Sequence, residues 1–196
     1  MSREKEILSL LVTKNYISTK EVANGGIPPR FLSFLAAKGG VSRISRGIYS
    51  LPGELPDEYF IIASKSENAV FSNLTALYLH GLSDRIPIIL DVTVKSSYKG
   101  SLQRKENVKL YYVKNEVITL GLTQVVTSFG NTVKCYDRER SICDIIKNKN
   151  TLDLELVNNA IRNYFYSNEK DLSTLYYYAE ELNISKKIRN TLEVLT

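Results

Sequence analysis

Cysteine and histidine are scarce in this sequence of 196 residues. It contains two cysteines, Cys135 and Cys143, and a single histidine, His80. A disulfide framework or a Cys/His zinc site needs more ligands and different spacings, so the sequence predicts neither. No metal site and no cofactor site are expected, and any mechanism that requires a histidine has to use His80.

Long apolar runs are also missing. No stretch of 18 or more uncharged apolar residues occurs, and the first six residues, MSREKE, lack the apolar block of a secretory signal. A P-loop, a GxGxxG motif and a nucleophile elbow are likewise absent. With 43% hydrophobic and 24% charged residues, the composition is that of a globular protein. We therefore expect a cytoplasmic protein with reduced thiols.

The net charge of +5 is confined to the first quarter of the chain. Residues 1–53 carry eight basic and three acidic side chains, whereas residues 54–196 carry 18 of each. This asymmetry indicates a small cationic domain, able to meet a polyanion, joined to a neutral one. We place the boundary between residues 53 and 54.

The first domain has the pattern of a winged helix-turn-helix. Apolar spacing predicts a helix over residues 3–14, and Ser18 with Glu21 forms a capping-box pattern for a second helix over residues 18–24. Prolines 28 and 29 open a third helix that runs to about residue 38. The run VSRISRGIYSLP then predicts a hairpin that turns at Arg46-Gly47. In such a domain the third helix enters the major groove and the hairpin is the wing.

A helical wheel of the third helix separates an apolar face from a face available to DNA. Phe31, Leu32, Leu35 and Ala36 make the apolar face, and we expect Phe34 at its edge to be mainly a core residue. Arg30 could read guanine, Ser33 could contact a base edge or a phosphate, and Lys20 could clamp a phosphate. Arg43 and Arg46 lie on the wing, where Arg46 could contact the backbone or a narrow minor groove. Tyr49 is expected to pack the wing onto the helices.

The second domain mixes strands and helices. Helices are predicted over residues 57–65 and 72–81, strands over 88–94, 108–113, 120–127 and 132–136, and helices again over 137–148, 152–166, 171–182 and 185–195. Strands in the middle and helices at the end indicate an α+β fold. The whole chain is thus predicted as an N-terminal winged helix-turn-helix followed by a larger α+β domain that ends in a helical cluster.

Two incomplete catalytic patterns overlap at Asp91. LDVTVK resembles half of a restriction-type nuclease site with Asp91 and Lys95, and GLSDRIPIILDVT weakly resembles a nucleotidyltransferase pattern. Both need a second carboxylate where Thr93 stands. We expect no catalytic residue here, a helix-end structural role for His80, and an N-cap at Asp137 with ion pairing around it.

Tyrosines are concentrated in the second domain, which holds 11 of the 13. They include the consecutive aromatics Tyr164-Phe165-Tyr166 and Tyr176-Tyr177-Tyr178. Three consecutive aromatics on a helix cannot all face one core, so some are expected to be exposed or to lie at an interface.

Three segments in order, RGIYSLP, SNLTALYLHGL with DRIP, and YDRERSICDII, resemble the AbiEi antitoxins over nearly the whole chain. The resemblance implies an antitoxin of a type IV abortive-infection system, which limits phage spread. It also implies a repressor that binds inverted repeats in its own promoter. The antagonist would be a nucleotidyltransferase-like toxin, with no stable complex expected. The resemblance adds Lys38 to the DNA-facing residues Arg30, Ser33, Arg43 and Arg46, and it carries over no catalytic residue.

Two alternatives stay open beside this interpretation. One is a DNA-directed enzyme, nuclease or nucleotidyltransferase-like, that the winged helix delivers to DNA. The other is a transcription factor whose second domain senses a ligand. Cooperative self-association on paired DNA repeats would suit the tyrosine-rich second domain under the antitoxin interpretation.

Overall fold

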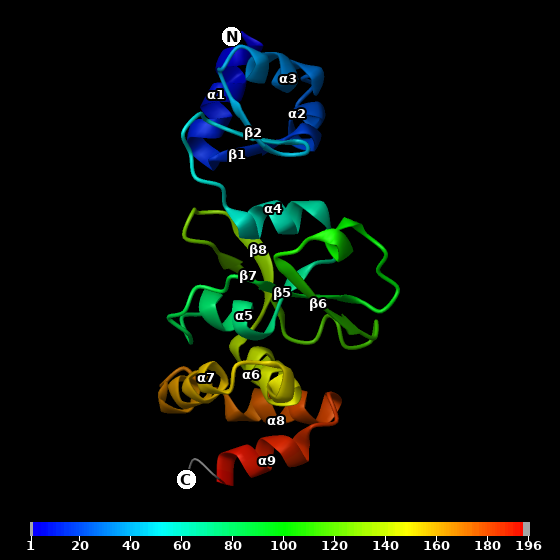
Figure 1. The fold of residues 1–196 in the computed structure, drawn as a ribbon, viewed down its shortest axis with the longest axis vertical. Helices are drawn as coiled ribbons and strands as arrows, with labels where there is room; N and C mark the ends of the chain where they lie inside the picture. The colour runs from blue at the N-terminus through cyan, green and yellow to red at the C-terminus, as the bar shows by residue number, and fades with distance from the viewer. Residues whose placement is uncertain (1, 194–196) are drawn as a thin grey trace. The chain divides into compact units, whose positions relative to one another are not determined.

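The computed structural model describes residues 2–193 and divides the chain into two compact units (Figure 1). The first unit comprises the chain up to Ile61 together with Val126–Asn131, and the second comprises the remainder. The boundary predicted between residues 53 and 54 therefore falls inside the first unit. Helices and sheets are mixed and the chain ends in helices, which confirms the α+β fold class.

The first unit has the element order of a winged helix-turn-helix. Its elements are α1 (Arg3–Lys14), β1 (Tyr16–Ser18), α2 (Thr19–Asn24), α3 (Arg30–Ala37), β2 (Ser42–Ser45) and β3 (Ile48–Ser50). β3 pairs antiparallel with both other strands, giving the sheet order β1-β3-β2. The wing predicted from Arg46-Gly47 is the hairpin of β2 and β3.

Local sequence explains where the helices of this unit begin. The Glu21 backbone N–H donates to the Ser18 hydroxyl at 3.1 Å, and the Glu21 carboxylate accepts from the Ser18 N–H at 2.8 Å. This reciprocal capping box fixes the start of α2. The core beneath α3 is one apolar cluster: Ile7, Leu11, Ile17, Val22, Ile27, Leu32, Leu35, Val41 and Tyr49.

A five-stranded sheet with the order β6-β5-β4-β8-β7 lies at the centre of the second unit. Its strands are β4 (Val70–Phe71), β5 (Leu90–Lys95), β6 (Val108–Val113), β7 (Leu122–Val126) and β8 (Thr132–Tyr136). β5 runs parallel to β6 and antiparallel to β4, and β4 runs parallel to β8. Such a mixed sheet is common in α+β folds.

The remaining regular elements of the described chain are helices. They are α4 (Glu58–Lys65), α5 (Asn73–Leu79), the 3-10 turns η1 (Ser101–Arg104) and η2 (Lys149–Thr151), and then α6 (Arg138–Asn148), α7 (Leu154–Tyr166), α8 (Leu172–Glu181) and α9 (Ser185–Glu193). The last two residues of the final predicted helix, 194 and 195, lie outside the described residues.

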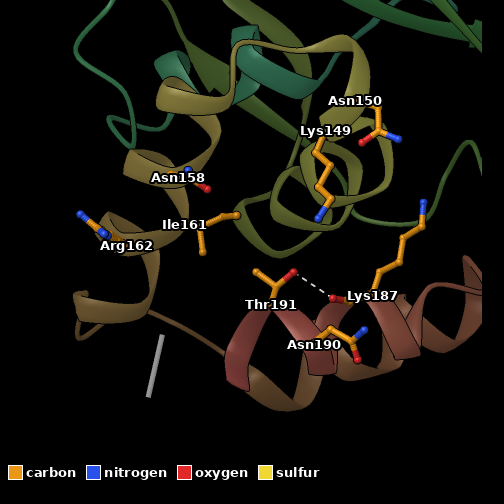
Figure 2. Close-up of a pocket in the computed structure, with 8 residues that line it drawn as sticks. All are labelled: Lys149, Asn150, Asn158, Ile161, Arg162, Lys187, Asn190 and Thr191. Atoms are coloured by element: carbon orange, nitrogen blue, oxygen red, sulfur yellow. Dashed lines mark hydrogen bonds between the residues drawn. The ribbon is translucent and has the colours of Figure 1, made fainter. Parts of the chain in front are cut away.

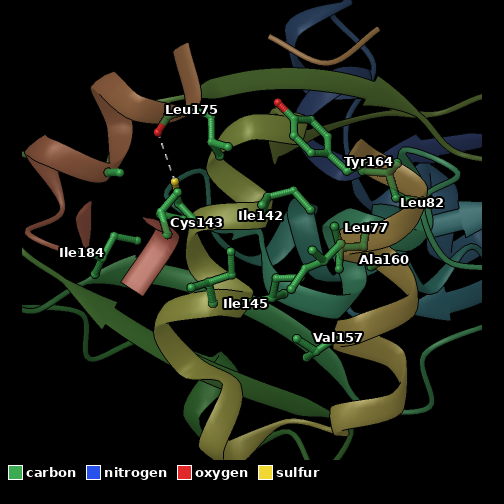
Figure 3. Packing of buried hydrophobic residues seen from close by; sticks show 14 of the residues in the cluster. Leu77, Leu82, Ile142, Cys143, Ile145, Val157, Ala160, Tyr164, Leu175 and Ile184 are labelled. Carbon is green, nitrogen blue, oxygen red and sulfur yellow. Dashed lines mark hydrogen bonds between the residues drawn. The ribbon is translucent and has the colours of Figure 1, made fainter. Parts of the chain in front are cut away.

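The helical cluster is built around α6. Ile142, Cys143, Ile145 and Ile146 of α6 are buried against side chains of α5, α7, α8 and α9 (Figure 3). Cys143 donates weakly to the Leu175 carbonyl at 3.7 Å, and burial raises the pKa of its thiol to about 12. Both cysteines are free and buried. Over residues 2–193, no helix has the length and apolarity needed to span a bilayer.

Candidate DNA-binding surface

The outer face of α3 presents polar, cationic and aromatic side chains together. Arg30, Ser33, Phe34 and Lys38 are exposed, whereas Leu32 and Leu35 are buried in the core of the unit. Arg30, Phe34 and Lys38 follow one another at intervals of four residues, so they form a single stripe along the helix. We call Arg30, Ser33, Phe34 and Lys38 the α3 face.

The expectation that Phe34 is mainly a core residue is wrong. Its side chain is 48% exposed and lies outside the apolar cluster of this unit. The Lys38 ammonium lies 4.3 Å from the centroid of the Phe34 ring, and the Phe31 ring lies 5.8 Å from it. The sequence placed Phe34 at the edge of the apolar face, and the smaller neighbours Leu32 and Leu35 fill the core instead. Phe34 is thus the residue of this surface that the sequence interpretation missed.

The wing contributes two further cations. Arg43 on β2 and Arg46 at the turn are both exposed. Tyr49 on β3 is 3% exposed and packs in the core, as expected, while its hydroxyl lies 3.2 Å from the Ser33 hydroxyl. This contact joins α3 to the wing, so Ser33 has a structural partner besides any DNA contact.

Four of the candidate DNA-contacting cations have no carboxylate partner in the described chain. Within residues 2–193, Arg30, Lys38, Arg43 and Arg46 take part in no ion pair. Because these four are exposed and unpaired, they can attract phosphate without first breaking an internal contact. The Glu21 carboxylate of the same unit pairs with Lys14 at 3.3 Å in addition to its capping role. Lys20, the candidate phosphate clamp, is exposed on α2.

The α3 face and the wing can make the two kinds of contact that nucleic-acid recognition requires. Arg30 begins α3, where a guanidinium can reach a base edge if the helix lies in a groove. Lys38, Arg43 and Arg46 supply positive charge on the third helix and the wing, which suits the phosphate backbone.

No family model matches this chain, and no curated protein does either. Among the solved structures that match is the Rv2827c protein from Mycobacterium tuberculosis, 11% identical, with a TM-score of 0.48, and the match covers 91% of this chain and 75% of the other. A likeness at this level carries no functional argument.

Asp91, the centre of the two incomplete catalytic patterns, is a buried residue of β5. It is 4% exposed, and its carboxylate accepts a hydrogen bond from the Leu74 N–H at 3.1 Å. Burial raises the pKa of this carboxyl to about 6, and the nearby Lys109 partly offsets that rise. Thr93, which stands where those patterns need a second carboxylate, donates to Ser72 at 2.8 Å. In the described part of the chain, no three His, Cys, Asp or Glu residues lie where they could hold a metal ion.

His80 and Asp137 meet near the start of α6. The His80 ring nitrogen Nε2 lies 2.7 Å from the Tyr136 carbonyl oxygen, so the ring contacts a carbonyl outside its own helix. Asp137 is the N-cap of α6 and accepts from the Arg140 N–H at 2.8 Å, as predicted. Burial raises the pKa of Asp137 above its usual value.

Ion pairing around this helix start is as expected. Arg140 is fully buried and donates to Asp144 at 3.0 Å. It also donates to the Val117 and Leu120 carbonyls at 2.9 and 2.8 Å. Arg138 pairs with Glu169 at the surface. These charges therefore have structural partners.

The tyrosine clusters divide into buried and exposed members. Tyr164 is buried and donates to Glu139 at 2.9 Å, and Tyr178 donates to Asp137 at 2.8 Å. Tyr166, Tyr176 and Tyr177 are exposed. The expectation that some of these aromatics cannot reach a core is confirmed.

Proposed function

We propose that the first unit binds operator DNA and that the protein represses its own operon. The observation that carries this proposal is the α3 face: Arg30, Phe34 and Lys38 form one exposed stripe, and within residues 2–193 its two cations have no carboxylate partner. The exposed cations of the wing extend the same positive character. A helix with such a face suits the major groove, and a basic wing suits the adjacent backbone.

We further propose that the protein is an antitoxin of the AbiEi type. The support is the ordered resemblance of RGIYSLP, SNLTALYLHGL and YDRERSICDII to that family. The proposal includes inverted repeats as the operator, a nucleotidyltransferase-like toxin as antagonist without a stable complex, and cooperative self-association on the paired repeats. It requires no catalytic residue in this chain and places the protein in the cytoplasm.

Operator binding is tested with the full chain and a labelled fragment of its own promoter. Arg30→Ala should weaken binding by about 1–3 kcal/mol if Arg30 makes a bidentate base contact. Arg3→Ala removes an exposed arginine at the start of α1, which belongs to neither the α3 face nor the wing, and is the matched control. Equal loss with both variants, or no loss with Arg30→Ala, would show that α3 is not the recognition helix.

The antitoxin role is tested by co-expression with the adjacent open reading frame. The wild-type protein should restore growth of cells that express the neighbouring gene. Arg30→Ala should restore it equally when both genes are expressed from foreign promoters, because the proposed neutralisation does not use operator DNA. A neighbouring gene that causes no growth arrest would contradict the antitoxin role and favour a plain transcription factor.

The enzyme alternative is tested at Asp91. Asp91→Asn keeps the shape of the side chain, and its amide oxygen can still accept from the Leu74 N–H. Neutralisation of the toxin should be unchanged in this variant if Asp91 has only a structural role. A folded Asp91→Asn protein that fails to neutralise the toxin would support the catalytic alternative.

A further inference from the structure

A concave pocket of about 570 Å³ opens in the helical cluster of the second unit (Figure 2). It is formed by η2, α7 and α9, and none of its residues belongs to the proposed DNA-binding surface. The lining consists of three cations, four neutral polar side chains and one apolar side chain: Lys149, Asn150, Asn158, Ile161, Arg162, Lys187, Asn190 and Thr191. Among residues 2–193, no carboxylate lines it.

Helix geometry explains why these side chains converge. Asn158, Ile161 and Arg162 are spaced i, i+3, i+4 on α7, and Lys187, Asn190 and Thr191 repeat that spacing on α9. Residues at this spacing share one face of a helix. Two helices therefore turn one face each towards the pocket, and η2 adds Lys149 and Asn150. Figure 2 shows Lys149 pointing towards α9, with Arg162 directed away at the outer rim.

The charged and polar groups of the pocket are little used by the protein itself. Within residues 2–193, Lys149 and Arg162 have no ion pair, and the amides of Asn150, Asn158 and Asn190 make no hydrogen bond. Lys187 donates once, to the Lys147 carbonyl at 3.3 Å, which leaves two of its N–H groups. Thr191 donates to the Lys187 carbonyl at 2.8 Å and keeps its acceptor lone pairs.

We infer that this pocket binds a nucleoside di- or triphosphate. Lys149 and Lys187, with Arg162 at the rim and no lining carboxylate among residues 2–193, match a polyphosphate, because ammonium groups form strong charge-assisted hydrogen bonds to phosphate oxygens. Asparagine amides both donate and accept, as the edge of a nucleobase requires. Ile161 supplies an apolar wall, and the volume lies within the usual range of small-ligand sites.

The concave shape distinguishes this site from a surface for duplex DNA. A duplex backbone is followed by cations along an open stripe, whereas Lys149 and Lys187 come from two elements that border one depression. This inference does not depend on the proposed repressor or antitoxin function. It assigns a ligand to the second unit, although the balanced charge of residues 54–196 does not predict one.

The experiment is calorimetric titration of the full chain with ATP, GTP, CTP and UTP, and separately with adenosine, inorganic pyrophosphate and a short DNA duplex. We expect one nucleotide per chain, with pyrophosphate and adenosine each binding at least about tenfold more weakly than the best nucleotide. Lys149→Glu and Asn190→Asp should each weaken nucleotide binding by about tenfold or more, the first because it places negative charge beside the phosphates and the second because it removes an amide that can donate to the base edge.

Lys186→Glu is the matched control. It reverses a charge on α9, the helix that carries Asn190. Lys186 is one residue from Lys187 but does not line the pocket. It should leave nucleotide affinity nearly unchanged, and circular dichroism should show all three variants folded. The inference is overturned if no nucleotide binds at millimolar concentration, if Lys186→Glu weakens binding as much as Lys149→Glu, if pyrophosphate binds as tightly as the nucleotides, or if the duplex displaces the nucleotide from the second unit.

Discussion

Phe34 lies at the surface with the Lys38 ammonium over its ring, and nearly half of its side chain is in contact with solvent. Replacing it with alanine should lower the free energy of unfolding by only about 1 kcal/mol, because a partly exposed ring has little burial to lose. Leu32→Ala, at a fully buried neighbour, should cost about 2–5 kcal/mol. Urea unfolding of both variants measures the contrast.

Phe34 and Leu32 should differ in the opposite sense when operator affinity, rather than stability, is measured. Phe34→Ala should weaken operator binding by more than its small effect on folding explains, because the ring lies between Arg30 and Lys38 on the α3 face. If Phe34→Ala instead unfolds the first unit as readily as Leu32→Ala does, the ring contributes to the core and the α3 face is defined wrongly.

Asp91 makes folding depend on pH. Its pKa is about 6 in the folded protein against 3.8 for the ordinary group, so the folded state holds the proton more tightly than the unfolded chain. Its contribution to stability is therefore greatest below pH 4 and is lost as the pH rises to about 6. A shift of this size corresponds to about 3 kcal/mol.

The variant Asp91→Asn isolates this contribution from other carboxyls with raised pKa values, such as Asp137 and Asp144. The difference in unfolding free energy between the variant and the wild type should change in favour of the variant between pH 4 and pH 7. Urea unfolding at the two pH values measures it. A difference that is the same at both would mean that Asp91 titrates as an ordinary surface carboxyl.

At the scale of elements, α6 joins the loop before β7 to the helical cluster through Arg140. Arg140→Met should destabilise the fold by about 3–5 kcal/mol, because it leaves Asp144 buried without its partner and two carbonyls without a donor. Arg138→Met removes a more exposed pair with Glu169 and should cost less than about 1 kcal/mol. Thermal unfolding ranks the two variants. Equal losses of stability would show that burying the Arg140 ion pair does not increase its contribution to stability.

Elements with strong local signals were predictable from the sequence. The capping box at Ser18, the N-cap at Asp137 and the turn at Gly47 depend on neighbouring residues, so short segments of sequence specify them. β1 and β4, of three and two residues, were not predicted. Strands so short have no periodicity of their own and exist because β3, β5 and β8 provide partners from far along the chain.

The candidate sites show the same limit. Periodicity indicated which face of α3 is apolar, but the packing of Leu32 and Leu35 decided that Phe34 stays outside. The pocket of η2, α7 and α9 brings together side chains from residues 149 to 191. The i, i+3, i+4 spacing on α7 and on α9 predicts no pocket until the fold shows that both helices border the same depression. Convergence of distant segments is a property of tertiary packing, which local patterns do not encode.

For the whole molecule, the uneven distribution of charge predicts how DNA binding responds to salt. If the two cations of the α3 face, the two of the wing and Lys20 each neutralise one phosphate, operator affinity should fall roughly 500-fold between 50 and 200 mM salt. Fluorescence anisotropy at several salt concentrations gives the slope. A flat response would contradict an electrostatic DNA contact, whatever the effect of Arg30→Ala.

The loop Val126–Asn131 has a consequence for dissecting this protein. Asp57 is fully buried, and its carboxylate accepts from the Thr127 hydroxyl at 2.6 Å and from the Asn131 amide at 2.9 Å. Asn15 likewise donates to the Phe129 carbonyl at 2.8 Å. A fragment that ends at Ile61 would keep Asp57 but lose Thr127 and Asn131. Residues up to Ile61 therefore do not contain all the contacts of the first unit. Transplanting it into another protein requires the hexapeptide VTSFGN to be supplied as well.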